Sequence, residues 1–389
     1  MNVVDIVIVV VLVGAAFHGL RLGALVQVLS FGGFLLGITL GALLADAVAP
    51  SIHSTTLRAA VALMLVIGLG IVLGVVGRIL GSMGNRAARR VRLGRVDSIA
   101  GVAVAVVAAL LSTWLVANEL ARTQFTSLSS AVQRSSIVRA VDSVMPPLPD
   151  FYSKIQSLLS GTGFPPVFSE LEPPPLRAST PSSAYADSLA APAEASTVKV
   201  LGQACGYLQE GSAFVVARNL VVTNAHVVAG EPSTTVVVQG GTYGATVVLF
   251  TPTFDLAVLR TNAPLGPPLT LDPGTVRHGD EGAIIGYPEN GTLTVTPAAV
   301  DGIITAQGRN IYNQGTVSRQ VYQVDANVQP GNSGGPLVGS NGQVVGVVFS
   351  RSTVYTDVGY ALTSPGVLTR VDQARSRTAP AGTGACVSG

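Results

Sequence analysis

Long apolar runs with few charged positions dominate the first third of the chain. Four of these runs are long enough to cross a bilayer as helices, which takes about 20 residues each. They cover residues 3–20, 22–45, 59–77 and 98–118. The last three contain no Asp, Glu, Lys or Arg, whereas an amphipathic helix on a soluble protein carries a polar face. The pattern predicts an α-helical four-span membrane domain over residues 1–118.

Arginines cluster in one of the short loops between these spans. Six of them lie between the third and fourth span: Arg78, Arg86, Arg89, Arg90, Arg92 and Arg95. Because Lys and Arg accumulate in short cytoplasmic loops, this loop is expected to face the cytoplasm. Four spans then place the N-terminus, and everything after about residue 118, on the extracytoplasmic (periplasmic) side of a multi-pass membrane protein.

Glycine recurs at every fourth position of the second span, at Gly33, Gly37 and Gly41. Such spacing permits close contact between helices in lipid, so these residues are candidates for a packing seam. Asp5 and His18 are polar but lie near span ends, where solvation is cheap, and we expect no transport role for them. A channel or exporter is therefore disfavoured. The first span lacks a basic start and is followed at once by another span, so we expect it to be retained rather than cleaved as a signal peptide.

Between residues 119 and 196 the composition shifts to Ser, Pro and Ala. Apolar positions at near-helical spacing within residues 127–145 predict a helical neck. Clustered prolines follow at residues 146–149, 165–166 and 173–175, and they favour an extended chain. The whole segment is interpreted as a neck and tether between two domains.

After residue 197 the pattern changes to short Val-rich runs separated by Gly, Asn and Pro. Candidate strands cover residues 212–217, 220–223, 235–239, 245–250, 256–260, 282–286, 292–296, 299–305, 320–325, 335–339, 343–350 and 358–362. This density predicts a large all-β domain over residues 197–389, either one sandwich or two small barrels. Ser364 and Pro365 open one C-terminal helix, which is expected to end near Arg375.

The overall composition is 48% hydrophobic and only 11% charged, with a net charge of +2. That balance provides no general basic field, so nucleic acid is not an expected partner. The 191 residues after 198 hold 21 charged side chains, which is again about 11%. A low charge content is thus shared by both domains, and the membrane prediction depends on the long uncharged runs and the arginine-rich loop.

Three short motifs in the β-rich half carry reactive side chains. TNAHVV at residues 223–228 presents His226 at the end of a strand. FDLAVL at residues 254–259 places Asp255 directly before another strand, and GNSGGP at residues 331–336 places Ser333 among glycines. Together they supply a nucleophile, a base and an orienting group.

Nucleophilic catalysis by serine needs all three groups. A serine hydroxyl is a weak nucleophile, so His226 is expected to accept its proton and return it to the leaving amine. Asp255 is expected to orient the imidazole, and the backbone N–H groups of Gly331 and Ser333 to form the oxyanion hole. Asp301 and Asp325 are alternative candidates for the orienting carboxylate, but they lack the strand context of Asp255. His278 lies in a polar turn, and we expect no role for it.

These motifs, in the order His, Asp, Ser, resemble those of the chymotrypsin-fold serine proteases, in particular the bacterial trypsin-like group that includes HtrA. We expect no PDZ module, because 56 residues follow Ser333. The four spans resemble the colicin V production protein family. The whole chain resembles the MarP-like family of membrane-anchored acid-resistance proteases of mycobacteria.

The resemblance implies a double-barrel serine endopeptidase that needs no cofactor and no metal and cleaves proteins of the cell envelope. In this fold the residue six before the nucleophile, here Asn327, commonly forms the base of the primary substrate pocket, with walls that include Ser350. The absence of an acidic residue at position 327 argues against a preference for Lys or Arg before the scissile bond. The only two cysteines, Cys205 and Cys386, are expected to form a disulfide outside the cytoplasm.

Acid resistance conflicts with the mechanism, because the base must be neutral and an ordinary imidazole gains a proton near pH 6.5. The Pro-rich tether is exposed in this interpretation, so we expect the enzyme to cleave itself there. The alternative function is a membrane stress sensor or scaffold that keeps the protease fold for peptide binding, and an intact triad argues against it.

Overall fold

The computed structural model describes residues 2–48, 55–89, 94–120, 131–142, 144, 167–168, 172–204, 206–238, 241–352 and 354–387. The chain divides into two compact units, Met1–Ser160 and Gly161–Gly389.

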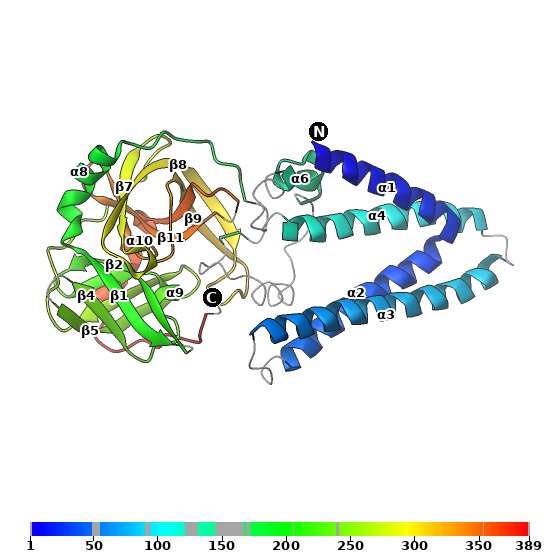
Figure 1. The fold of residues 1–389 in the computed structure, drawn as a ribbon, viewed down its shortest axis with the longest axis horizontal. Coiled ribbons are helices and arrows are strands. Elements are labelled where there is room, and N and C mark those ends of the chain that lie inside the picture. The colour runs from blue at the N-terminus through cyan, green and yellow to red at the C-terminus, as the bar shows by residue number, and fades with distance from the viewer. Residues whose placement is uncertain are drawn as a thin grey trace. The chain divides into compact units, whose positions relative to one another are not determined.

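The first unit contains four long apolar helices (Figure 1). They are α1 (Val3–Leu22), α2 (Ala24–Val48), α3 (Thr55–Arg89) and α4 (Gly94–Leu120). Each has a stretch long and apolar enough to cross a membrane, and each exposes several large hydrophobic side chains. The prediction of four long apolar helices, each able to cross a membrane by length and composition, is confirmed.

The glycines of α2 form the predicted packing seam against α3. A Cβ atom on Gly33 or Gly37 would lie 2.3 Å from the carbonyl oxygen of Leu73 or Leu69, respectively, and one on Gly41 would lie 2.6 Å from that of Leu65. Any larger residue would therefore push the helices apart. This close backbone contact is the packing that small residues provide in membranes.

Asp5 has a structural role at the start of α1. Its carboxylate accepts hydrogen bonds from Ser135 Oγ at 2.6 Å and from a backbone N–H in the first turn of helix α6 (Ser136–Asp142) at 3.1 Å. Trp114 of α4 holds the other end of α6, because its Nε1 donates to Asp142 Oδ1 at 2.8 Å. The helical part of the predicted neck is thus tied to the ends of two spans.

The second unit is built from two closed barrels of six strands each. The first barrel contains β1 (Thr197–Ala204), β2 (Tyr207–Ala217), β3 (Leu220–Thr223), β4 (Thr234–Val238), β5 (Gly241–Thr251) and β6 (Leu256–Thr261), in the order β1-β2-β3-β6-β5-β4. The second contains β7 (Glu281–Gly286), β8 (Thr294–Gly308), β9 (Val317–Asp325), β10 (Pro336–Gly339), β11 (Val344–Arg351) and β12 (Val358–Thr363), in the order β10-β11-β12-β9-β8-β7. The all-β double-barrel prediction is confirmed, and so is the closing helix α10 (Ser364–Arg375).

Two strands differ from the sequence prediction. β1 was not predicted, although Val198 and Val200 alternate with exposed or half-buried positions as a strand requires. β8 joins two predicted strands into one, because a register shift between Val300 and Gly302 lets it bend without ending.

The last part of the predicted tether belongs to the protease unit. Helix α8 (Ser183–Glu194) buries Leu189 and three alanines against β7 and β10. The preceding residues 172–182 form neither helix nor strand, and two carboxylates of the second barrel accept their backbone N–H groups: Asp301 from Leu176 at 2.8 Å and Asp325 from Ala178 at 2.6 Å. The compact unit therefore starts before residue 197, the boundary that composition predicted.

A large apolar cluster fills the junction between the two barrels. Phe214 and Leu256 contribute from the first barrel, and Val347, Phe349 and Tyr360 from the second, all fully buried. This junction fixes the loops of the two barrels relative to each other, and those loops carry the three motifs.

Candidate active site

His226 lies on a single helical turn, α9 (Ala225–Val228), directly after β3. Its neighbours Ala225, Val227 and Val228 are buried and fix the turn in the first barrel. The imidazole itself keeps 9% of its surface exposed. The motif thus holds the backbone firmly while one edge of the ring reaches solvent.

Asp255 lies in the turn before β6 and is fully buried. Its φ of 65° is in the left-handed region, which is unusual for a residue with a side chain. Its N–H donates to Thr251 O at 2.8 Å, and Asn224 Nδ2 donates to its carbonyl oxygen at 2.9 Å. The bond from Asn224 explains why an asparagine stands two residues before His226, a role that sequence reasoning missed.

Asp255 and His226 form a close pair. His226 Nδ1 lies 2.8 Å from Asp255 Oδ2 and 3.0 Å from Oδ1, and the backbone N–H of His226 also donates to Oδ1 at 3.0 Å. Since a carboxylate only accepts hydrogen bonds, the proton of a neutral imidazole sits on Nδ1. The lone pair of Nε2 is then free to act as a base.

The loop around Ser333 depends on its glycines. Gly331 and Gly334 have φ values of 92° and 84°. A Cβ atom on Gly334 would lie 2.0 Å from Ser212 O, and one on Gly331 would lie 2.2 Å from Tyr287 O. Only glycine fits both the conformation and the space.

Ser212 of β2 holds this loop against the first barrel. Its N–H donates to Ser333 O at 2.7 Å, and its Oγ donates to Gly331 O at 2.6 Å. Thr223, the first residue of the TNAHVV motif, in turn donates its Oγ1 to Ser212 O at 2.7 Å. Sequence reasoning missed Ser212, because no local motif marks it.

These hydrogen bonds occupy the carbonyl oxygens of Gly331 and Ser333, whereas two backbone N–H groups of the same loop donate to no described acceptor. Among the described residues, neither the N–H of Gly331 nor that of Ser333 has a hydrogen-bond partner. Two such N–H groups close together bind a negatively charged oxygen. Gly211 of β2 lets the helical turn of His226 and the Ser333 loop both pack closely against this strand. A Cβ atom on Gly211 would lie 2.7 Å from Val227 and 3.1 Å from Ser333 O.

The predicted pocket residues have different environments. Ser350 is buried in β11. Asn327 is exposed, and its place at the base of the substrate pocket stays a prediction. The next residue, Val328, is buried, and a Cβ atom on Gly359 would lie 2.4 Å from its Cγ2. The side chain turned inward at this point is therefore aliphatic.

The competing polar residues are not partners of His226. Asp301 and Asp325 bind the segment before α8, as described above. His278 Nδ1 lies 2.9 Å from the carbonyl oxygen of Asp301, and its side chain is 52% exposed. Cys205 lies outside the described residues, so its pairing with Cys386 stays a prediction.

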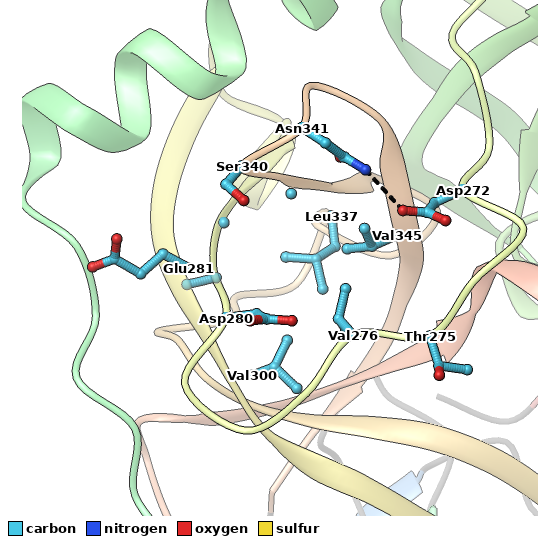
Figure 2. Close-up of a pocket in the computed structure, with 13 residues that line it drawn as sticks. Asp272, Thr275, Val276, Asp280, Glu281, Val300, Leu337, Ser340, Asn341 and Val345 are labelled. Atoms are coloured by element: carbon cyan, nitrogen blue, oxygen red, sulfur yellow. Dashed lines mark hydrogen bonds between the residues drawn. The ribbon is translucent and has the colours of Figure 1, made fainter.

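A separate cavity of about 220 Å³ lies at one end of the second barrel (Figure 2). Val300, Leu337 and Val345 form its walls, and Asn341 Nδ2 donates to Asp272 Oδ2 at 2.8 Å on its rim. None of the three predicted catalytic residues lines this cavity. It is therefore not the catalytic site.

Glu231 follows α9 and is the described carboxyl group with the most clearly raised pKa. Burial raises its pKa from 4.5 to about 7, against the opposing effect of a hydrogen bond from Thr234 Oγ1. Its other oxygen, Oε1, is buried without a partner in the described part of the chain. The carboxyl packs against Gly202, where a Cβ would lie 2.1 Å from Glu231 Cδ.

This raised pKa predicts that acid stabilises the fold at this site. The folded state holds the proton more tightly than the unfolded state, so the stabilising contribution is complete below pH 4.5 and is lost as the pH rises through 7. Between pH 5 and 8, the free energy of unfolding of the wild type should fall by about 2 kcal/mol more than that of the Glu231→Gln variant. Thermal unfolding of both forms at each pH measures the difference. The exposed Glu194→Gln serves as the control, and a Glu231→Gln profile that parallels the wild type would contradict the prediction.

Comparison with known proteins identifies two family regions. Residues 211–347 match the trypsin-like peptidase domain, and residues 4–146 match the colicin V production protein family. The chain is 36% identical to the serine protease Rv3671c of Mycobacterium tuberculosis over 394 aligned positions, which cover 99% of this chain and 98% of the relative. It is also 37% identical to a probable DegP-like periplasmic serine endoprotease of Chlamydia trachomatis, over 42% of this chain and 33% of that one.

A solved structure gives the same result for the protease unit. The crystal structure of the Rv3671c protease in its active form is 37% identical, covers 56% of this chain and 96% of that one, and superposes with a TM-score of 0.54. Both halves of the chain, and not the protease domain alone, are thus shared with the mycobacterial relative. The chain belongs to the MarP-like family of the mycobacterial serine protease Rv3671c and is a serine endopeptidase with four membrane-capable helices.

Proposed function

We propose that this enzyme is anchored in the cytoplasmic membrane by α1–α4 and cleaves cell-envelope proteins on the extracytoplasmic side through Ser333, His226 and Asp255. The observation that carries the proposal is the His226–Asp255 pair, with 2.8 Å between Nδ1 and Oδ2 and a fully buried carboxylate. The DegP-like relatives are described as periplasmic, which supports an extracytoplasmic protease unit.

Acylation starts with the attack of Ser333 Oγ on the scissile carbonyl carbon. His226 Nε2 accepts the hydroxyl proton as the bond forms. The carbonyl oxygen becomes an oxyanion and receives hydrogen bonds from the N–H groups of Gly331 and Ser333, which have no other partner among the described residues. His226 then donates the proton to the leaving amine, and water releases the acyl group by the same steps in reverse.

Asp255 orients the imidazole and stabilises the imidazolium that forms during attack. Its two hydrogen bonds to His226, one from the ring and one from the backbone, fix the ring plane as well as the tautomer. Ser333 Oγ has no hydrogen-bond partner in the described part of the chain, so no bond must break before it reacts. Distances to the base in enzymes without substrate are often long and shorten on binding.

The proposed physiological role is survival of acid and envelope stress, which the family resemblance supports. A proteomic comparison of envelope fractions from cells that carry the wild-type enzyme or Ser333→Ala tests it: the clients should persist uncut only in the variant. If Ser333→Ala protects cells in acid as well as the wild type does, the sensor or scaffold function replaces the enzymatic one.

We further propose that the enzyme cuts its own connecting segment on the N-terminal side of residue 172. The residues after 172 are held by Asp301 and Asp325, and backbone bound in this way is a poor protease substrate. Purified full-length enzyme should therefore release a fragment that begins before residue 172, as measured by gel electrophoresis and mass spectrometry, while Ser333→Ala stays intact. Identical behaviour of the two proteins would exclude self-cleavage.

A further inference from the structure

The turn of residues 287–291, between β7 and β8, packs against the oxyanion loop of residues 330–333. A Cβ atom on Gly331 would lie 2.2 Å from Tyr287 O and 3.0 Å from Glu289 N. Glu289 and Asn290 have φ values of 52° and 56°, in the left-handed region that residues with a side chain seldom adopt. Such a backbone persists only where the surrounding structure holds it.

Lys199 of β1 holds this turn with all three of its ammonium protons. Its Nζ donates to Asn290 O at 2.8 Å, to Asn290 Oδ1 at 3.1 Å and to Gly291 O at 2.8 Å. The same Nζ lies 5.2 Å from the ring centroid of Tyr287, at the start of the turn. One side chain of the first barrel thus contacts both ends of a turn that belongs to the second barrel.

Glu210 of β2 lies beside Lys199. Lys199 pairs with Ser212 in the register of β1 and β2, so Glu210, two residues away, is its diagonal neighbour on the same face. Burial raises the pKa of Glu210, and the nearby charge of Glu289 acts in the same direction. The charge of Lys199 and the N–H of Asn290 lower this pKa. The turn therefore has a cation at its carbonyl oxygens and a carboxylate near one of its N–H groups.

The turn sets the direction of one oxyanion donor. Glu289 N donates to Pro330 O at 2.8 Å. Because the C=O and N–H of a trans peptide point in opposite directions, this bond directs the N–H of Gly331 away from the turn. Ser212 fixes the following peptide group instead, since its Oγ accepts from Tyr287 N at 2.9 Å and donates to Gly331 O. The orientation of the Gly331 N–H thus depends on the N–H of Glu289.

We propose that Lys199 is a positioning residue for the oxyanion hole, which holds the turn so that the N–H of Glu289 binds Pro330 O and the N–H of Gly331 faces the substrate oxyanion. The inference rests on the proposed catalytic function of Ser333. Lys199 acts through the turn and not by contact with the reacting atoms. Since the oxyanion forms in the transition state, loss of this support lowers kcat and leaves KM nearly unchanged.

The test compares Lys199→Met, which removes the ammonium but keeps an apolar stem over Tyr287, with Lys199→Arg, which keeps a cation with several donors. Full-length proteins in detergent hydrolyse an unfolded protein substrate, and a peptide boronic acid inhibits them. The boronate bonded to Ser333 places a hydroxyl where the oxyanion binds. We expect Lys199→Met to lower kcat by about 10- to 100-fold and to raise the boronate inhibition constant by a similar factor, with KM within about twofold. Lys199→Arg should restore most of both.

Arg260→Met is the matched control. Arg260 is another half-buried cation of the first barrel that donates to backbone carbonyl oxygens, namely Arg375 O at 3.1 Å and Arg377 O at 2.9 Å. These carbonyl groups lie at the end of α10 and just after it, not on the turn of residues 287–291. The variant should keep kcat and the boronate inhibition constant within about twofold of the wild type.

A residue that only stabilises the fold would lower the unfolding temperature without changing kcat per reactive serine, as counted by titration with a fluorophosphonate. If Lys199→Met keeps the wild-type kcat and boronate affinity, or if Arg260→Met loses as much of both, the inference is wrong. If Lys199→Met does not fold, Lys199→Gln replaces it in the same comparison. A wild-type enzyme in which Ser333 does not react would instead contradict the proposed function, so the two failures are distinguishable.

Discussion

Replacement of Ser333 by alanine is expected to reduce peptide hydrolysis by about 10⁴- to 10⁶-fold at neutral pH. The hydroxyl is the only group lost, and no described group depends on it for a hydrogen bond. The backbone bonds that hold the loop, from Ser212 to Ser333 O and to Gly331 O, remain in the variant. The fold should therefore be unaffected, with a change in unfolding temperature of about 1 °C or less.

The measurement is the steady-state rate on an unfolded protein substrate, with thermal unfolding of the same samples. Ser340→Ala, on the exposed turn between β10 and β11, is the matched control and should keep full activity. A Ser333→Ala enzyme that keeps more than about 1% of the wild-type rate would mean that another group is the nucleophile. A large loss of stability would mean that the hydroxyl has a structural bond.

The chemistry of this site could be predicted from sequence because each catalytic group is embedded in a short motif. Two glycines beside Ser333 occupy positions where a Cβ would collide with Ser212 or Tyr287, so the local sequence itself encodes the conformation. The same holds for the seam of α2, where Gly37 sits against Leu69 O. In both cases the requirement for glycine is visible without knowledge of the partner.

The residues that sequence reasoning missed act across the chain. Ser212 has ordinary neighbours in sequence, and its role exists only because two barrels meet. Helix α8 was missed for a similar reason. Its Ala and Ser content and Pro192 indicate a linker, whereas its alanines provide the flat face that β7 and β10 cover. Composition therefore predicted the two domains but placed their boundary too late.

The second large effect is expected from Asp255→Asn, which should reduce turnover by about 10⁴-fold near pH 7. The backbone N–H of His226 donates to Oδ1, so the amide oxygen of Asn will take that position and the amide NH₂ the position of Oδ2. That NH₂ then faces His226 Nδ1, which lies 2.8 Å from Oδ2 in the wild type. Because two donors cannot face each other, the imidazole must carry its proton on Nε2, where it cannot accept one from Ser333.

The matched controls are Asp301→Asn and Asp325→Asn. Both residues are buried carboxylates that accept backbone N–H groups, as Asp255 does, but they hold the segment before α8. They should lower stability while leaving turnover within about threefold of the wild type. If either control loses as much activity as Asp255→Asn, the assignment of the orienting carboxylate is wrong.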